Sequence, residues 1–294
     1  MSDISLLPQI LINGILFGTM YGIAAVGLSL IFGTMRLIFL AQGSMIVLFA
    51  YLCYWFLTLL GIDPYLSLAL ILPIAVAIGM GFYYGLFKEA AALEDKNVSL
   101  LLAVGIMYLV ENLMLVLWTA NPRSVVTSYT TLVFHPFGLN IGFTRLLALA
   151  LAILAAVGVY FFLKRTLIGT AVRAASEDMT STTLMGINPN WVNAVAFAAG
   201  IGLAGVAAVA LAGVYSFDPN YGFTFAIKAL IALTLGGIGN VYGALLGGIL
   251  LGVIESSSQF YIGIGWSEAV SYGVFLLVLT IRPYGLFGGS MKKA

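Results

Sequence analysis

Long apolar segments constrain this chain more than any other feature. A helix needs about 20 apolar residues to cross the hydrocarbon core of a bilayer. Segments of or near that length recur at 9–33, 38–60, 65–87, 98–119, 143–163, 191–215 and 268–282. Charged residues make up only 8% of the 294 residues, too few to cover the surface of a water-soluble fold. We therefore expect an all-α polytopic membrane protein, with residues 1–294 forming a single transmembrane domain.

A glycine-rich region lies between the last two of these segments. Its central run, ALTLGGIGNVYGALLGGILLG at 232–252, holds seven glycines in 21 positions. Glycine costs about 1 kcal/mol relative to alanine inside a helix. We therefore predict a discontinuous, re-entrant element: a half-helix over 226–238, a turn at GGIGN within the membrane, and a return over 241–257. Such a turn must be buried in protein or line a wet cavity, and with it the chain has about eight transmembrane helices.

Close helix packing is the alternative explanation for these glycines. Two stripes have the four-residue spacing that lets helices approach each other: Gly239, Gly243 and Gly247, and Gly14, Gly18 and Gly22. We assign the earlier stripe to packing alone. A second interruption, IFGTMRLIFLAQGSM at 31–45, lies in the opposite half of the chain and contains Gln42 and Ser44. Two interruptions in opposite halves are typical of an internal pseudo-repeat with a transport pathway between the halves.

The distribution of Lys and Arg predicts the orientation, because these residues are retained on the cytoplasmic side. With the N-terminus outside, nine of them fall inside: Arg36, Lys88, Lys96, Lys164, Arg165, Arg173, Arg282, Lys292 and Lys293. Only Arg123, Arg145 and Lys228 fall outside, so the C-terminus is expected in the cytoplasm. The N-terminus lacks the basic start of a cleavable signal peptide, so the first span is expected to stay.

The sequence offers little for catalysis. It has no GxxxxGK[ST] pattern for ATP, and His135 and Cys53 are its only histidine and cysteine, so we expect no catalytic residue and no metal site. A net charge of +1 argues against a nucleic-acid partner. Glu111 is the charge that stands out inside a span, where it either lines a pathway or locks helices together. Lys228 and Glu255 flank the glycine-rich region and are expected at its interfacial ends.

The loop at 164–190 is the one sizeable polar segment on the inside. Ala171–Met185 is predicted to form a short helix that stops at Gly186, and Asn188 with Pro189 caps and starts the next span. This helix would display charged side chains to a partner. A solvated connection between two spans is the alternative.

Several blocks of this sequence resemble the permease subunits of branched-chain amino-acid ABC importers, and most of all the smaller, high-affinity-system permease. The blocks are NGILFGTMYGIAAVGLSLIFG, RAASEDMTSTTLMGINPNWV, IKALIALTLGGIGNVYGALLGGILLGVIES and PYGLFG, and the resemblance extends over nearly the whole chain. The resemblance implies a bacterial inner-membrane subunit forming half of a translocation pathway. It also implies four kinds of partner: a second permease in a heterodimer, two ATP-binding subunits, an extracytoplasmic substrate-binding protein and the membrane lipid. ATP and Mg would bind to the ATPases, so no cofactor is expected on this chain.

The resemblance also assigns roles to particular residues. The inside loop becomes the coupling helix that docks in the ATPase, through Arg173, Ala174, Ala175, Glu177, Asp178 and Gly186. The family block K-x(7)-GG-x-G-x(3)-G-x(3)-G falls on Lys228, Gly236, Gly237, Gly239, Gly243 and Gly247. We expect Gln42, Gly43, Ser44, Gly237, Gly239 and Asn240 to line the substrate pathway, between walls that carry almost no charge.

One motif departs from the family pattern and bears on the substrate. Where the family commonly has NFAHG, this chain has FLAQG, with Phe39 and Gln42 in place of Asn and His. Branched-chain or related amino acids are the primary expectation, and urea or short amides are the alternative within the family. An ion-coupled secondary transporter and a passive channel or membrane scaffold are the alternatives of other classes.

Overall fold

Helices make up most of the described chain. The computed structural model describes residues 7–92, 96–135, 139–282 and 285–288. The helices run in the order α1 (Leu7–Met35), α2 (Gln42–Leu60), α3 (Leu68–Phe82), the π-helix η2 (Tyr83–Phe87), α4 (Lys88–Ala92), α5 (Lys96–Trp118), α6 (Phe143–Arg165), α7 (Leu167–Glu177), α8 (Met179–Leu184), α9 (Pro189–Ala212), α10 (Tyr221–Gly236), α11 (Val241–Tyr261) and α12 (Ile264–Ile281). Within these ranges eight helices are long and apolar enough to cross a membrane, as expected.

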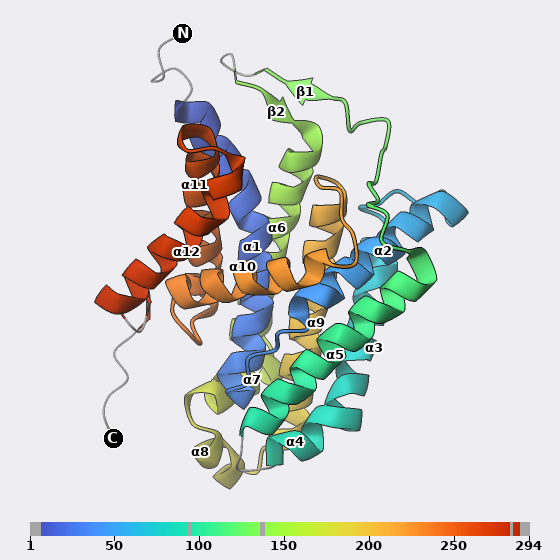
Figure 1. The fold of residues 1–294 in the computed structure, drawn as a ribbon. Coiled ribbons are helices and arrows are strands. Elements are labelled where there is room, and N and C mark those ends of the chain that lie inside the picture. The colour runs from blue at the N-terminus through green and yellow to red at the C-terminus, as the bar shows by residue number, and fades with distance from the viewer. Residues whose placement is uncertain (1–6, 93–95, 136–138, 283–284, 289–294) are drawn as a thin grey trace.

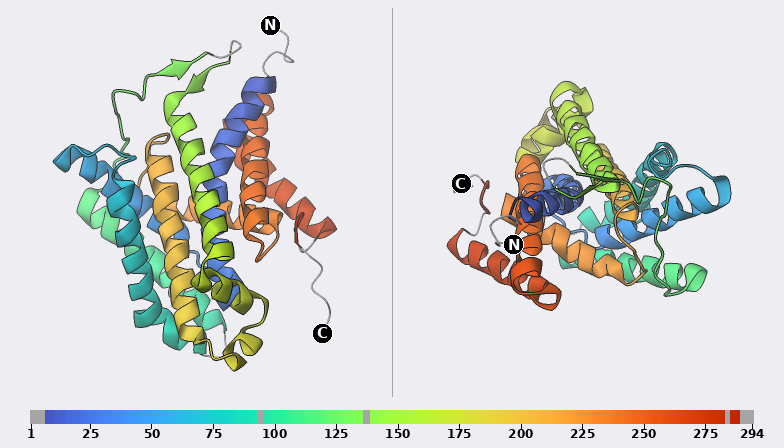
Figure 2. Two further views of the ribbon diagram at one scale, coloured as in Figure 1. Left: turned by 180° about the vertical axis from the view of Figure 1, so that it is seen from behind. Right: turned by 90° about the horizontal axis from the view of Figure 1, so that it is seen from above.

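The molecule is built around two central helices, α1 and α9. In the most apolar 18-residue stretch of each, 83% and 89% of the residues are buried. α1, α6, α9 and α11 stand upright, whereas α10 lies across them (Figure 1). Seen from above, α1 is viewed end on and α10 along its length (Figure 2). The transverse helix α10 therefore lies between the two ends of the upright bundle.

The two ends differ in content. The N-terminal end holds the start of α1 and the two-residue strands β1 (Val133–Phe134) and β2 (Ile141–Gly142). Hydrogen bonds join its parts: Gln9 Nε2 donates to the Asn140 carbonyl at 2.8 Å, and Arg145 donates to Asn13 Oδ1 at 2.9 Å. The opposite end carries α7 and α8 and is called the α7 end below.

Glycines allow the tightest helix contact, between α1 and α11. A Cβ on Gly14 would lie 2.6 Å from Val253 Cα, and one on Gly18 would lie 2.6 Å from Ile249 Cα. Gly248 likewise abuts the backbone of Gly22. These approaches confirm that the early glycine stripe serves packing. In the later stripe, Gly243 and Gly247 pack on α10, while a Cβ on Gly239 would meet no described atom within 4 Å.

The break in the glycine-rich region is confirmed. α10 ends at Gly236, and Gly237 and Gly239 have φ values of 100° and 84°, which favour glycine. Asn240 then caps α11 by accepting hydrogen bonds from the backbone N–H groups of Tyr242 and Gly243. The placement differs from the expectation, because α10 is transverse and α11 is long enough to be a full span rather than a short return.

The second interruption is also a real discontinuity. α1 ends at Met35, and a non-helical segment with a turn at 40–41 follows before α2 begins at Gln42. Figure 1 shows this segment running from the lower end of α1 back to the level of α10. Leu37 and Phe39 are buried, and Phe39 packs edge-on against Phe87 and Phe197. Protein therefore surrounds this non-helical backbone, as a membrane requires. The pseudo-repeat between the two halves of the chain stays a prediction.

Most of the basic residues are distributed as expected. At the α7 end, Arg36 follows the last residue of α1, Lys164 and Arg165 end α6, and Lys88 and Arg173 lie on α4 and α7. Arg145 lies instead in the first turn of α6, and Arg123 in the loop after α5. Lys292 and Lys293 lie outside the described residues.

Lys228 does not follow the expected distribution, because it is buried, with only 5% of its surface exposed. The expectation that Lys228 and Glu255 mark interfacial ends was therefore wrong: both are buried and bonded to each other.

Candidate functional site

The loop between α6 and α9 contains two short helices instead of the single one expected over 171–185. α7 ends at Glu177, and Asp178, with φ −150° and ψ 103°, breaks the helical path. Its carboxylate caps α8 by accepting hydrogen bonds from Thr180 N, Ser181 N and Ser181 Oγ. The Ser181 hydroxyl bond is the main cause that lowers the pKa of Asp178 below its ordinary value of 3.8.

The end of this loop follows the prediction. Gly186 has φ 84° directly after α8, a left-handed conformation that stops the helix. Asn188 Oδ1 then accepts from the Asn190 N–H at 2.9 Å, and Pro189 is the first residue of α9. The backbone and capping preferences of Gly, Asn and Pro are enough to explain why the helix boundaries fall at these residues.

Several large apolar side chains are exposed on this loop. Leu167 is 90% exposed, Leu184 85% and Met185 71%, and they project beside exposed Arg173, Glu177, Asp178 and Gly186. Exposed apolar patches with a polar rim mark protein interaction surfaces. Of the other two residues assigned to coupling, Ala174 is half-buried and Ala175 is buried within the fold. Ala175 thus positions α7 and offers no surface to a partner.

A cavity of about 610 Å³ lies behind this loop. It is lined by the last turns of α1 and α6, one face of α7, and the turn between α10 and α11. Its polar side chains belong to Arg36, Lys164, Arg173, Glu177, Asn240 and Tyr242, besides Ser29 and Ser176, and Gly239 also lines it. The structure therefore brings two residues assigned to coupling together with two assigned to the pathway. Three cations against one carboxylate make the lining positive.

The other predicted pathway residues lie elsewhere. Gln42, Gly43 and Ser44 are fully buried at the start of α2, and a Cβ on Gly43 would lie 2.5 Å from the Ala226 nitrogen near the start of α10. Gly237 instead packs on Gly288 beside the end of α10. The predicted lining is thus split between the two ends of the transverse helix, and sequence reasoning did not foresee this because it treated α10 as an upright arm.

The Gln42 side chain is incompletely bonded. Its Nε2 donates to the Gly200 carbonyl at 3.1 Å, while its Oε1 has no hydrogen-bond partner among the described residues. The Ser44 hydroxyl is also buried without a hydrogen-bond partner among the described residues. Buried polar atoms without partners are costly, so the start of α2 is a place where a rearrangement or a polar ligand could satisfy them.

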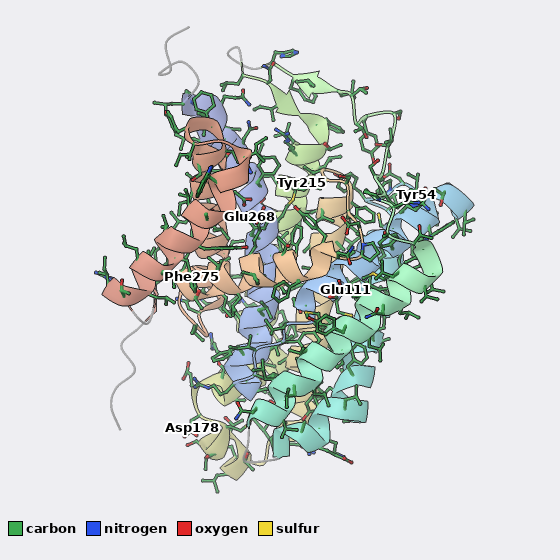
Figure 3. The ribbon with its side chains drawn as sticks, viewed as in Figure 1. Tyr54, Glu111, Asp178, Tyr215, Glu268 and Phe275 are labelled. Carbon is green, nitrogen blue, oxygen red and sulfur yellow. The ribbon has the colours of Figure 1, made fainter. Side chains whose placement is uncertain are left out.

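The charge buried in the membrane region is Lys228, which the sequence analysis placed at an interface. Lys228 Nζ lies 2.6 Å from Glu255 Oε1 and 3.7 Å from Glu268 Oε1. It also lies 3.4 Å from the hydroxyl of Tyr21, with the Tyr21 ring centroid 5.3 Å away. Glu111, the acid singled out from the sequence, is only half-buried and lies on α5, apart from Glu268 (Figure 3).

Comparison with known proteins gives concordant matches. The model of a family described as branched-chain amino acid transport system / permease component matches residues 10–279. The high-affinity branched-chain amino acid transport system permease protein BraD of Pseudomonas aeruginosa is 32% identical over 95% of both chains. LivH of Escherichia coli K12, which carries the same description, is 29% identical, again over 95% of both.

A third relative and a solved structure also match over nearly the full length of the chain. A protein described as a probable branched-chain amino acid transport permease protein, LivH of Methanocaldococcus jannaschii, is 28% identical over 97% of this chain and 94% of its own. A solved structure, PsaBC from Streptococcus pneumoniae in complex with Fab, aligns with a TM-score of 0.53 and 13% identity, covering 96% of this chain and 95% of that one. At that identity the likeness concerns the fold alone.

Proposed function

The chain belongs to the family of permease components of branched-chain amino acid transport systems, and from this we propose that it forms half of the translocation pathway of an ATP-driven importer. Its cargo would be a branched-chain or related amino acid, since the relatives BraD and LivH are described as permeases for that class. Such a component works with other subunits of its transporter. The proposed set is a second permease, two ATP-binding subunits and an external substrate-binding protein.

The observation that carries this proposal is the α7–α8 loop. It combines exposed apolar and charged side chains at one end of the bundle, as a docking surface for an ATPase requires. One face of α7 also lines the cavity that Gly239 and Asn240 share. A displacement of α7 by the ATPase would therefore change the shape of the cavity beside the break between α10 and α11. ATP and Mg are assigned to the partner subunits, and this chain is proposed to perform no chemistry itself.

The proposed orientation places the α7 end in the cytoplasm of a bacterial inner membrane. The basic residues of the described chain favour this, since most of them belong to elements at that end. The C-terminal segment begins at the same end, because the Leu286 N–H donates to the Leu235 carbonyl at 2.9 Å and Asn240 Nδ2 donates to the Phe287 carbonyl at 3.0 Å. We therefore propose a cytoplasmic C-terminus.

Reconstitution of the complete complex tests the transport function. We expect proteoliposomes containing both permeases and both ATPases, supplied with binding protein and ATP, to accumulate labelled leucine. Omission of ATP or of the ATPases should abolish accumulation. Accumulation by this chain alone under a proton or sodium gradient would instead establish an ion-coupled transporter, and flux without ATP would establish a channel.

A glycine substitution tests the coupling role of the loop. Gly186→Val places a β-branched residue at φ 84° on the proposed docking surface, and we expect the substrate-stimulated ATPase rate of the complex to fall to near its unstimulated level. Gly61→Val is a matched control, because Gly61 also follows a helix with positive φ, 65°, and also has open space around it, but lies at the opposite end. Unchanged stimulation in Gly186→Val would remove the loop from the mechanism.

A further inference from the structure

Three charged side chains meet where α10, α11 and α12 converge, and we call them the charge cluster: Lys228, Glu255 and Glu268. The two acids differ in their surroundings. Glu255 holds the lysine at 2.6 Å with a side chain only 9% exposed, whereas Glu268 approaches to 3.7 Å with a side chain 51% exposed. The lysine is thus fixed on one side by a buried carboxylate and met on the other by a carboxylate that can move away.

The cluster is unusual in a chain with so few charges. Ionisable side chains within membrane helices are costly, and they mark substrate pathways or lock helices together. In the described part of the chain, Lys228 is the only cation within 4 Å of either acid. A lock between α10 and α11 needs only Lys228 and Glu255, so that lock does not require the half-exposed Glu268.

We propose that Lys228 and Glu268 form a contact site for the zwitterionic head of an amino acid, with the lysine receiving the carboxylate and Glu268 the ammonium group. The site rests on the proposed transport function and names the residues that recognise the substrate class. Glu255 acts as a positioning residue that keeps Lys228 in place. This site changes the expectation that the pathway offers almost no charge.

The order of charges explains why a zwitterion fits. In the free protein the signs alternate from Glu255 to Lys228 to Glu268. An amino acid inserted between Lys228 and Glu268 extends the row, because its carboxylate faces the lysine and its ammonium group faces Glu268. Each charged group then has a neighbour of the opposite sign. Urea or a short amide would separate Lys228 from Glu268 without supplying either charge, so the site disfavours those substrates.

The position of the cluster suits an early contact on the transport route. In Figure 3 Glu268 lies on the N-terminal side of α10, the side that the proposed orientation places outside. Tyr21 contributes a hydroxyl and a ring face to Lys228 at the same place. The cavity lined by α7 and the α10–α11 turn lies toward the opposite end. The transverse helix therefore separates a charged contact site from the proposed cytoplasmic exit.

The test uses the complete transporter in proteoliposomes, with labelled leucine and its binding protein. Glu268→Gln removes the charge at a half-exposed position, so the complex should assemble in normal amounts. Loss of one charged contact is expected to lower leucine uptake about tenfold or more. Glu111→Gln, a neutralised acid that is also incompletely buried in a membrane helix, is the matched control and should keep wild-type uptake.

A charge exchange separates recognition from structure. Lys228→Glu combined with Glu255→Lys preserves the buried pair but reverses the charge offered to the substrate, so uptake should stay low although the complex assembles. Wild-type uptake by Glu268→Gln, or recovery of uptake in the exchange variant, would overturn the site and leave the transport function standing. A wild-type complex that accumulates urea or an amide and no amino acid would overturn both.

Discussion

Lys228 and Glu255 show how a single pair of residues can hold two differently inclined helices. Their side chains are 7% and 9% exposed and come from the transverse α10 and the upright α11. A buried ion pair is not by itself strongly stabilising, because both charges lose their hydration. Removing one partner is different, since it leaves an uncompensated charge in a poorly solvated place.

This asymmetry gives a stability prediction. Glu255→Ala should lower the free energy of unfolding by about 3–5 kcal/mol, because Lys228 loses its closest counter-charge. The double variant Lys228→Met with Glu255→Leu should recover most of that loss, since no charge remains buried. Thermal unfolding of the purified complex in detergent measures both. A double variant less stable than Glu255→Ala would contradict this account.

The glycines on α1 and α11 carry a second residue-scale prediction. A Cβ at Gly248 would collide with the backbone of Gly22, which cannot rotate away as a side chain could. Gly248→Ala should therefore destabilise the protein by about 1–3 kcal/mol through overpacking. Gly105→Ala on α5 is the control, because no described atom lies within 4 Å of its added Cβ and the helix gains up to about 1 kcal/mol from alanine. Equal melting temperatures for the two variants would exclude close packing as the cause.

Residue roles could be predicted where they depend on local spacing. The four-residue interval of Gly14, Gly18 and Gly22 indicated a packing face without any knowledge of its partner. The pair between Lys228 and Glu255 could not be predicted in this way, because the residues are 27 positions apart and their contact depends on how α10 packs against α11. From the sequence alone each looked like a charge at the end of a span.

At the scale of elements, capping residues decide the shape of the coupling loop. Thr166 caps α7, Asp178 caps α8 and Asn188 caps α9, each by accepting a backbone N–H within the next three residues. Gly186 and Pro189 were predicted as boundaries because their backbone preferences are strong. The split at Asp178 was missed, since the same acid is also acceptable inside a solvated helix.

The cap on α8 should depend on pH. The pKa of Asp178 is lowered, mainly by the Ser181 hydroxyl, so its contribution is present above its ordinary value of 3.8 and is lost as the pH falls through the lower folded pKa. Amide exchange at residues 180–184, corrected for intrinsic rates, should show protection at neutral pH that disappears only in strong acid. Asp178→Asn keeps a capping oxygen that does not titrate in this range, so its protection should be independent of pH. Identical acid profiles for the two proteins would rule out Asp178 as the titrating cap.

The orientation of α10 shows where element prediction ends. Its length and the glycine turn that follows it could be predicted from composition and from the cost of glycine in a helix. The angle at which a membrane helix lies is set by its neighbours rather than by its own sequence. Here the contacts between Gly43 and Ala226 at one end, and between Gly237 and Gly288 at the other, hold α10 across the bundle. The pathway residues predicted as one group were separated for the same reason.

At the scale of the whole molecule, the two ends are suited to different partners. At the N-terminal end, hydrogen bonds of Gln9 and Arg145 join the start of α1 to the segment around β2 and the first turn of α6. The α7 end carries exposed apolar side chains and the cavity of about 610 Å³, and so has both a surface to be pushed and space into which to move. A permease driven by cytoplasmic ATPases needs that asymmetry.

Single-cysteine labelling tests this asymmetry directly. Cys53 is the only cysteine of the sequence and is fully buried, so the native chain should react little with a membrane-impermeant maleimide. Met185→Cys is at a 71% exposed position at the α7 end, and Val126→Cys is at a 69% exposed position in the loop that follows α5. If Lys and Arg retention sets the orientation, Met185→Cys reacts in inside-out vesicles and Val126→Cys in intact cells. The reverse pattern would place the proposed coupling loop outside, beyond the reach of any cytoplasmic ATPase, and the mechanism built on α7 would fail with it.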